Sequence, residues 1–138
     1  MKILIDTNIL IDVFAKREPY VKASAAALRL CGGKAAGYIL AGQTTDVFYI
    51  LSHEIKNNAA VKEIIKTLTE NLNILDVTVA DINKAVNGGM EDYEDALLAY
   101  RGKRANIDLI VTRNDDGFKE SPVPAITPEV YLKKYFEG

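Results

Sequence analysis

The sequence predicts an α/β domain in which a central, mostly parallel sheet lies between two layers of helices. Short apolar segments of strand length alternate with longer segments of helical periodicity along all 138 residues. The short segments are almost wholly apolar, as expected of parallel strands that are covered on both faces. No repeat, low-complexity tract or linker interrupts the pattern, so we expect residues 1–138 to form a single domain.

The first elements of this pattern are a strand, two helices and a second strand. Residues 2–5 are rich in isoleucine and too short for a helix, which suits a buried strand. Three helix N-cap residue types follow at 6–8, so we expect a helix from about residue 9. Pro19 opens a second helix that stops at the glycines 32–33, and residues 35–39 form the second strand.

The rest of the chain continues the alternation. Apolar residues recur at helical spacing from residue 43 to residue 55 and again from 59 to 70. The further predicted strands are residues 72–75, 107–112 and 123–126, and the further predicted helices are residues 79–86, 91–101 and 128–136.

Composition narrows the class of protein. A net charge of -2 argues against a protein that coats nucleic acid, but metal-binding carboxylates can produce the same balance in a nuclease. The single cysteine, Cys31, cannot form an internal disulfide, and Asp6 interrupts the first apolar run too early for a signal peptide. No apolar stretch reaches the roughly 18 residues of a membrane span. We therefore expect a cytoplasmic protein without a membrane anchor.

Acidic and amide side chains stand where a parallel sheet binds its ligands. Such sheets bind beyond the carboxyl ends of their strands. Asp6 directly follows the first predicted strand, and residues 114–116 (Asn-Asp-Asp) follow the fourth. Asp46 and Asp95 lie in predicted helices, next to apolar residues that lead into the packed part of each helix. We expect the four clusters to converge at one crevice.

Each cluster also has a purely structural interpretation. Asp6 can cap the first helix, and Asp46 can be an exposed acid near a helix start. Asp92 can be an ordinary helix-start acid, and residues 114–117 have the composition of a plain turn. Taken singly the clusters are weak evidence, whereas their common location favours a site.

Converging carboxylates cannot all stay ionised without a cation, because like charges raise one another's pKa. Oxygen-only ligands select hard ions such as Mg²⁺ or Mn²⁺, which activate a bound water and neutralise charge on a phosphate. No cysteine–histidine spacing indicates zinc, and no phosphate-binding P-loop is present. A phosphatase with Asp6 as nucleophile would need an acid two residues on, where the chain has Asn8. The residues thus favour metal-assisted phosphodiester hydrolysis.

Four segments, in order and at these spacings, resemble the PIN domain and in particular its VapC-like toxin branch. They are residues 3–10, 45–51, 92–97 and 111–114. The resemblance covers nearly the whole chain and implies a PIN-like three-layer α/β/α fold. It also implies a Mg²⁺- or Mn²⁺-dependent endoribonuclease, commonly a homodimer, that is the toxin of a type II pair and is inhibited by an antitoxin from a neighbouring gene. The class of RNA cleaved stays open.

The resemblance assigns roles by position. Asp6 and Asp95 match metal-binding aspartates, and Asp46 stands as a third ligand where most members have glutamate. Asn114 stands where a fourth acid is frequent and completes the expected catalytic set. Gly117 replaces an aspartate that the family often has just before the phenylalanine. These departures motivate an alternative, a catalytically weakened PIN-like module that binds RNA or a protein without cleavage.

Further residues receive secondary roles. The possible outer metal ligands are Asp92, Asp115 and Asp116. The supporting residues are Thr7, Asn8 and Thr112. The candidates for binding substrate phosphates are Arg113, Lys16 and Arg17.

Overall fold

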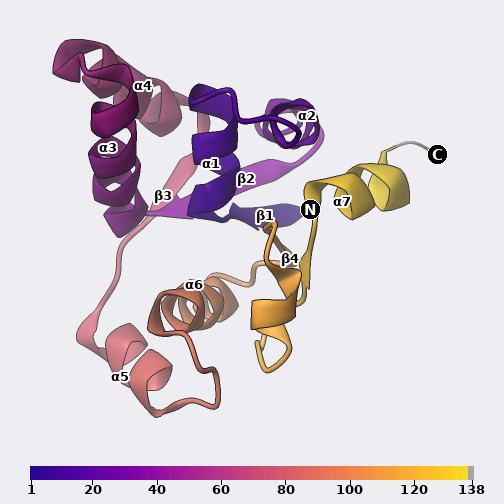
Figure 1. The fold of residues 1–138 in the computed structure, drawn as a ribbon. Coiled ribbons are helices and arrows are strands. Elements are labelled where there is room, and N and C mark those ends of the chain that lie inside the picture. The colour runs from indigo at the N-terminus through magenta and orange to yellow at the C-terminus, as the bar shows by residue number, and fades with distance from the viewer. Residues whose placement is uncertain (137–138) are drawn as a thin grey trace.

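The computed structural model describes residues 1–136 and contains one five-stranded sheet in the order β3-β2-β1-β4-β5 (Figure 1). Each strand is parallel to its neighbours. The strands are β1 (Lys2–Ile5), β2 (Ala36–Leu40), β3 (Asn73–Leu75), β4 (Leu109–Val111) and β5 (Ala125–Ile126). All five lie within or one residue beyond the predicted segments, and the prediction of a mostly parallel sheet is confirmed.

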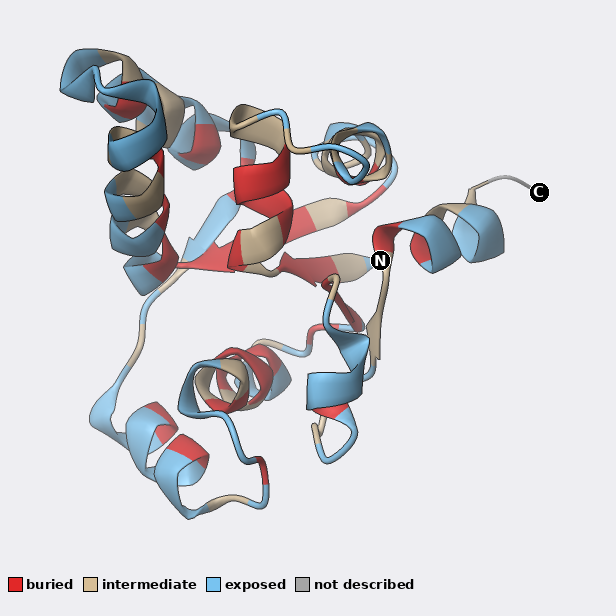
Figure 2. Cartoon of the chain, viewed as in Figure 1, coloured by how far each residue is buried: buried red, intermediate tan, exposed pale blue. Residues whose placement is uncertain are grey.

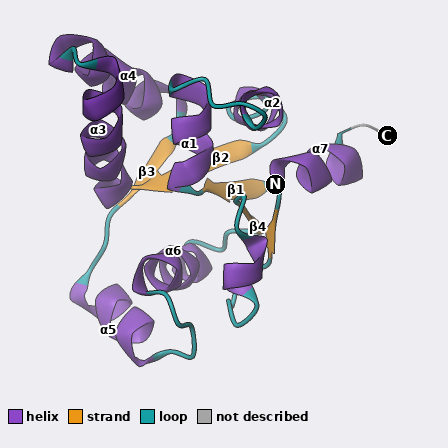
Figure 3. Cartoon of the chain, in the orientation of Figure 1, coloured by secondary structure: helices purple, strands orange, loops and turns teal. Residues whose placement is uncertain are grey.

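Helices connect the strands (Figure 3). They are α1 (Thr7–Phe14), α2 (Val21–Arg29), α3 (Ala41–Ile55), α4 (Asn58–Asn71), α5 (Val79–Asn87), α6 (Tyr93–Arg104) and α7 (Pro128–Tyr135). The predicted helices are present, with ends that their caps determine. Asp92, for example, accepts a hydrogen bond from the Asp95 amide, so α6 begins after it rather than at residue 91. The short 3₁₀ turn η1 (Asp115–Phe118) was not predicted.

The sheet separates two apolar cores, which confirms the three-layer arrangement. Ile3 and Ile5 of β1 pack with residues of α1, α2, α3, α4 and α7, whereas Leu4 packs with α5, α6 and η1. This follows from the period of a strand, whose successive side chains point to opposite faces. Buried residues accordingly line the sheet-facing sides of both helical layers (Figure 2).

Strand register brings the candidate site residues to one edge of the sheet. Ile5 pairs with Val111, and the Asp6 amide donates to the Val111 carbonyl at 3.0 Å. Asp6 and Thr112 therefore leave the sheet side by side. Helices α1 and α3 begin directly at this carboxyl edge, where parallel α/β sheets bind ligands.

The helices of residues 1–136 include none with the length and apolar character that a bilayer crossing requires.

Candidate active site

Asp6 is held on both carboxylate oxygens at the end of β1. The Thr7 amide donates to Oδ1 at 2.7 Å, and the Thr112 hydroxyl donates to Oδ2 at 2.7 Å. Burial raises the pKa of Asp6, the two hydrogen bonds oppose this rise, and the negative charge of Asp92 adds to it. Asp6 thus caps α1 and also faces the carboxyl edge, so its two interpretations are compatible.

Asn8 and Thr112 join the start of α1 to the end of β4. The side-chain nitrogen Nδ2 of Asn8 donates to Asp6 Oδ2 and to Thr112 Oγ1, each at 3.4 Å. In turn, the Arg113 amide donates to Asn8 Oδ1 at 3.3 Å, and the Asn114 amide donates to Thr112 Oγ1 at 3.0 Å. Thr112 is fully buried, so its hydroxyl is fixed between Asp6 and the loop that follows β4.

Gln43 is a positioning residue that sequence reasoning missed. Its Nε2 donates to the Ile5 carbonyl at 2.8 Å and to Thr7 Oγ1 at 3.2 Å, while its Oε1 accepts from the Leu40 amide at 2.7 Å. One buried side chain therefore ties the ends of β1 and β2 to the starts of α1 and α3. Its place at the third position of a helix, from which a side chain reaches back to the N-cap, was the available signal.

The acids are divided between two hollows on either side of the first turn of α6, not gathered in the single crevice that we expected. Asp6 and Asp46 line the first hollow, and Glu94, which the sequence did not single out, lines it too. The polar residues of the second hollow include Asp92, Asp95, Asn114 and Asp116. Consecutive residues of α6 point in different directions, so Glu94 and Asp95 enter different hollows.

Carboxylates of the two hollows nevertheless act on one another. Burial raises the pKa of Asp95 to about 6, with further increases from the negative charges of Asp6, Asp92 and Glu94. Burial likewise raises the pKa of Glu94, and Asp46, Asp6 and Asp92 add to that rise. The two hollows therefore form one negatively charged region at the carboxyl edge.

Gly117 lets η1 approach the second hollow closely. A Cβ atom at this position would lie 2.7 Å from Asn114 Nδ2 and 3.0 Å from Asp95 Oδ2. The chain therefore has glycine, where the family often has aspartate, at a position where a side chain would press against Asn114 and Asp95. Asp116 lines the second hollow, whereas Asp115 is exposed and is not among its lining residues.

The residues predicted to bind phosphates lie elsewhere or have other contacts. Arg113 Nε donates to Asp12 Oδ2 at 2.7 Å, and its guanidinium carbon lies 4.0 Å from the centre of the Tyr20 ring. Lys16 and Arg17 follow α1 at the end opposite Asp6, roughly 12 Å along the helix axis. Arg17 pairs there with Glu54 at the end of α3.

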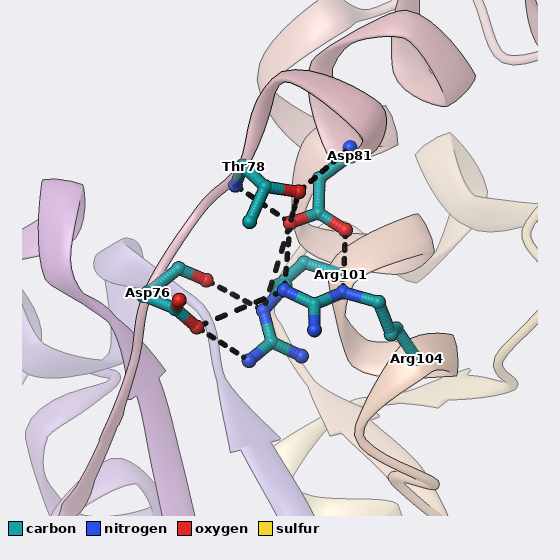
Figure 4. Close-up of polar contacts among 5 residues, drawn as sticks. All are labelled: Asp76, Thr78, Asp81, Arg101 and Arg104. Atoms are coloured by element: carbon teal, nitrogen blue, oxygen red, sulfur yellow. Dashed lines mark hydrogen bonds and ion pairs between the residues drawn. The ribbon is translucent and has the colours of Figure 1, made fainter.

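Two further arginines of α6 also have acidic partners (Figure 4). Arg104 binds the buried Asp81 through Nε at 2.8 Å and Nη2 at 2.9 Å. Arg101 donates from Nη2 to Asp76 Oδ1 at 3.0 Å and is itself buried. These contacts join α6 to α5 and to the loop after β3.

The donor chemistry of the site fits a hard divalent cation. Each lining carboxylate or amide offers oxygen, and the positive charge of an ion would offset the burial and the mutual repulsion that together raise the pKa values of Asp6 and Asp95. Among residues 1–136, no group of three histidine, cysteine, aspartate or glutamate side chains lies close enough together to hold one metal ion.

Fold and site together define a three-layer α/β domain with acidic and amide side chains at the carboxyl edge of a parallel sheet. A family model described as the PIN domain matches residues 2–116, and the chain belongs to this family. Ribonuclease VapC1 of Aquifex aeolicus (strain VF5) is 26% identical in an alignment 140 residues long that spans 97% of this chain and 95% of that protein.

Two solved structures share the fold. VapBC2 from Rickettsia felis, bound to a DNA fragment from its promoter, has a TM-score of 0.71 at 18% identity and covers 92% of this chain and 98% of its own. A toxin–antitoxin complex from Klebsiella pneumoniae has a TM-score of 0.68 at 22% identity, with coverages of 91% and 96%. The expected PIN-like fold is therefore confirmed.

Proposed function

We propose that this chain is a Mg²⁺- or Mn²⁺-dependent endoribonuclease that hydrolyses RNA phosphodiester bonds as the toxin of a type II toxin–antitoxin pair. The observation that carries the proposal is the carboxylate of Asp6, which is fixed by two hydrogen bonds and acts electrostatically on Asp95. Similarity to a protein named ribonuclease VapC1 and to the structure of a toxin–antitoxin complex supports it.

The proposed roles follow from the contacts. Asp6 and Asp95 bind the ion, and Asp46 and Asn114 complete the site from the two hollows. An ion held by these residues would supply an activated water and would neutralise charge on the scissile phosphate. Thr112 keeps the Asp6 carboxylate in one orientation through its 2.7 Å hydrogen bond. The residues of the chain therefore contribute by orienting the carboxylate that binds the proposed ion.

The test is RNA cleavage by purified Asp6→Asn and Asp95→Asn variants with Mn²⁺. Each substitution keeps the shape of the side chain but removes its charge, so we expect a loss of roughly 100-fold or more. Asp108→Asn is the matched control, because Asp108 is exposed before β4 and contacts only the Lys2 amide among the described side-chain hydrogen bonds. Cleavage by both site variants at the wild-type rate would refute the metal site.

The alternative is a PIN module that binds RNA or a protein without cutting. The absence, within residues 1–136, of three converging ligands and the close approach of Gly117 favour it. Calorimetric titration with Mn²⁺ separates the two: no binding at millimolar concentration would support the non-catalytic module, whereas binding that Asp6→Asn abolishes would support the nuclease.

An antitoxin is the proposed protein partner, because the structural neighbour from Klebsiella pneumoniae is described as a toxin–antitoxin complex. RNA as substrate makes the cytoplasm the expected location. A small DNA-binding protein encoded beside this gene that co-purifies with the chain and blocks its cleavage would support the pairing.

A further inference from the structure

The first hollow combines an apolar wall with an acidic rim. It has a volume of about 250 Å³ and lies between the first turns of α3 and α6, beside Asp6. Its lining includes the apolar residues Val77 and Leu97 together with Tyr93, and the acidic residues Asp46 and Glu94 line the same space. Because pockets for drug-sized ligands measure roughly 300–1,000 Å³, this volume suits one flat ring system.

Tyr93 is well placed to stack on such a ring. It is the first residue of α6, directly before Glu94, and 47% of its surface is exposed although it borders apolar side chains. Exposed aromatic residues beside a single-stranded nucleic acid stack on unpaired bases, which every base permits.

The rim restricts which base fits. Ionised carboxylates only accept hydrogen bonds, so they pair with a base edge that presents donors. Guanine offers two adjacent donors on its Watson–Crick edge, the N1–H and the N2 amino group, which match the two oxygens of one carboxylate. Uracil presents its single N–H between two carbonyl acceptors, which a carboxylate repels. Asp6 is already engaged by Thr7 and Thr112, and Asp46 belongs to the proposed ion site. Glu94 therefore remains as the acceptor, and it has the longer side chain.

We propose that this hollow binds the base of an unpaired guanine next to the scissile phosphate. Tyr93 stacks on the base, and Glu94 accepts hydrogen bonds from N1–H and N2. The inference rests on the proposed ribonuclease function and deepens it by naming the nucleotide at the cut.

Single-stranded RNA substrates that carry guanosine or inosine at the cleavage position test the contact with Glu94, since inosine lacks the N2 amino group. We expect the wild type to prefer guanosine about tenfold in kcat/KM, and Glu94→Gln to lose this preference. We expect Tyr93→Ala to raise KM about tenfold, because the substitution removes one stacking contact with a base. Tyr93→Phe keeps the aromatic ring and should have the KM of the wild type. Tyr49→Ala and Glu63→Gln, at exposed positions on α3 and α4, are the matched controls.

Binding to catalytically silenced protein separates this inference from the proposed function. Fluorescence anisotropy with labelled oligonucleotides and the Asp95→Asn protein requires no cleavage. Guanosine preference in binding, lost in Glu94→Gln, supports the base site even if the wild type cuts no RNA. Equal affinity for guanosine and inosine oligonucleotides, with Tyr93→Ala behaving like Tyr49→Ala, overturns the base site even if cleavage is normal.

Discussion

Arg113 lies beside the site, yet its contacts indicate that it positions other residues. Its partner Asp12 is fully buried and also accepts from the Ser24 hydroxyl at 3.2 Å. We expect Arg113→Ala to lower the free energy of unfolding by about 3 kcal/mol, because it leaves a buried carboxylate without its cation. Urea denaturation measures this change. Lys16→Ala is the control and should change stability by less than about 0.5 kcal/mol; an equally small effect of Arg113→Ala would contradict the positioning role.

Asp95 is a residue at which proposed function and stability oppose each other. Its pKa of about 6 shows that the folded protein resists ionising it. We expect Asp95→Asn to stabilise the metal-free protein at pH 7 by on the order of 1 kcal/mol. The gain is limited to this size because solvent screens much of the unfavourable interaction at a half-buried group.

The pH dependence provides a check on Asp95. Because its folded-state pKa is raised, the wild type loses stability relative to the variant as pH rises from about 4 to about 6. Thermal unfolding of both proteins in chelator across this range measures the difference. A metal-free Asp95→Asn protein that is less stable than wild type at pH 7 would contradict the repulsion inferred at the site.

At the scale of elements, the contact between α5 and α6 depends on Asp81. Hydrogen bonds from Arg104, with further ones from Thr78, hold the pKa of the buried Asp81 carboxyl well below its ordinary value. A lowered folded-state pKa adds stability that is present above about pH 4 and is lost as pH falls through the folded-state pKa. We expect Asp81→Asn to cost about 3 kcal/mol at pH 7 and much less at pH 2. Equal losses at both pH values in urea denaturation would refute this role.

Local patterns predicted the elements well, since apolar periodicity and helix caps depend on neighbouring residues. They could not predict how α6 is rotated about its axis, which the packing of Ala96 and Ala99 against the sheet determines. For this reason the sequence predicted a site role for Asp95 but not for Glu94, which lines the first hollow. Arg113 and Asp12 are 101 residues apart in sequence, so nothing local revealed their ion pair. Gly117 was noticed only as a departure from the family, because only the folded chain places Asp95 where a side chain at position 117 would meet it.

At the scale of the whole molecule, we expect a homodimer. Val79, Ile82 and Val86 form an exposed apolar stripe along α5, and such a stripe costs free energy in water unless another surface covers it. Light scattering should give about twice the 15.2 kDa mass of one chain. Val86→Asp should shift the protein toward the monomer, whereas the control Val130→Asp, on α7, should not. A wild type that stays monomeric at high concentration would exclude the dimer.

The bond between Thr112 and Asp6 joins residues 106 positions apart, and β4 must pair with β1 before it can form. A ribosome therefore synthesises the segments from β1 to α6 before the hydroxyl that orients Asp6 exists. Products of translation that stalls before residue 112 lack this hydroxyl and Asn114 together. The order of synthesis thus delays the proposed nuclease activity until β4 and the loop after it are made, and any product that ends before them carries an incomplete site.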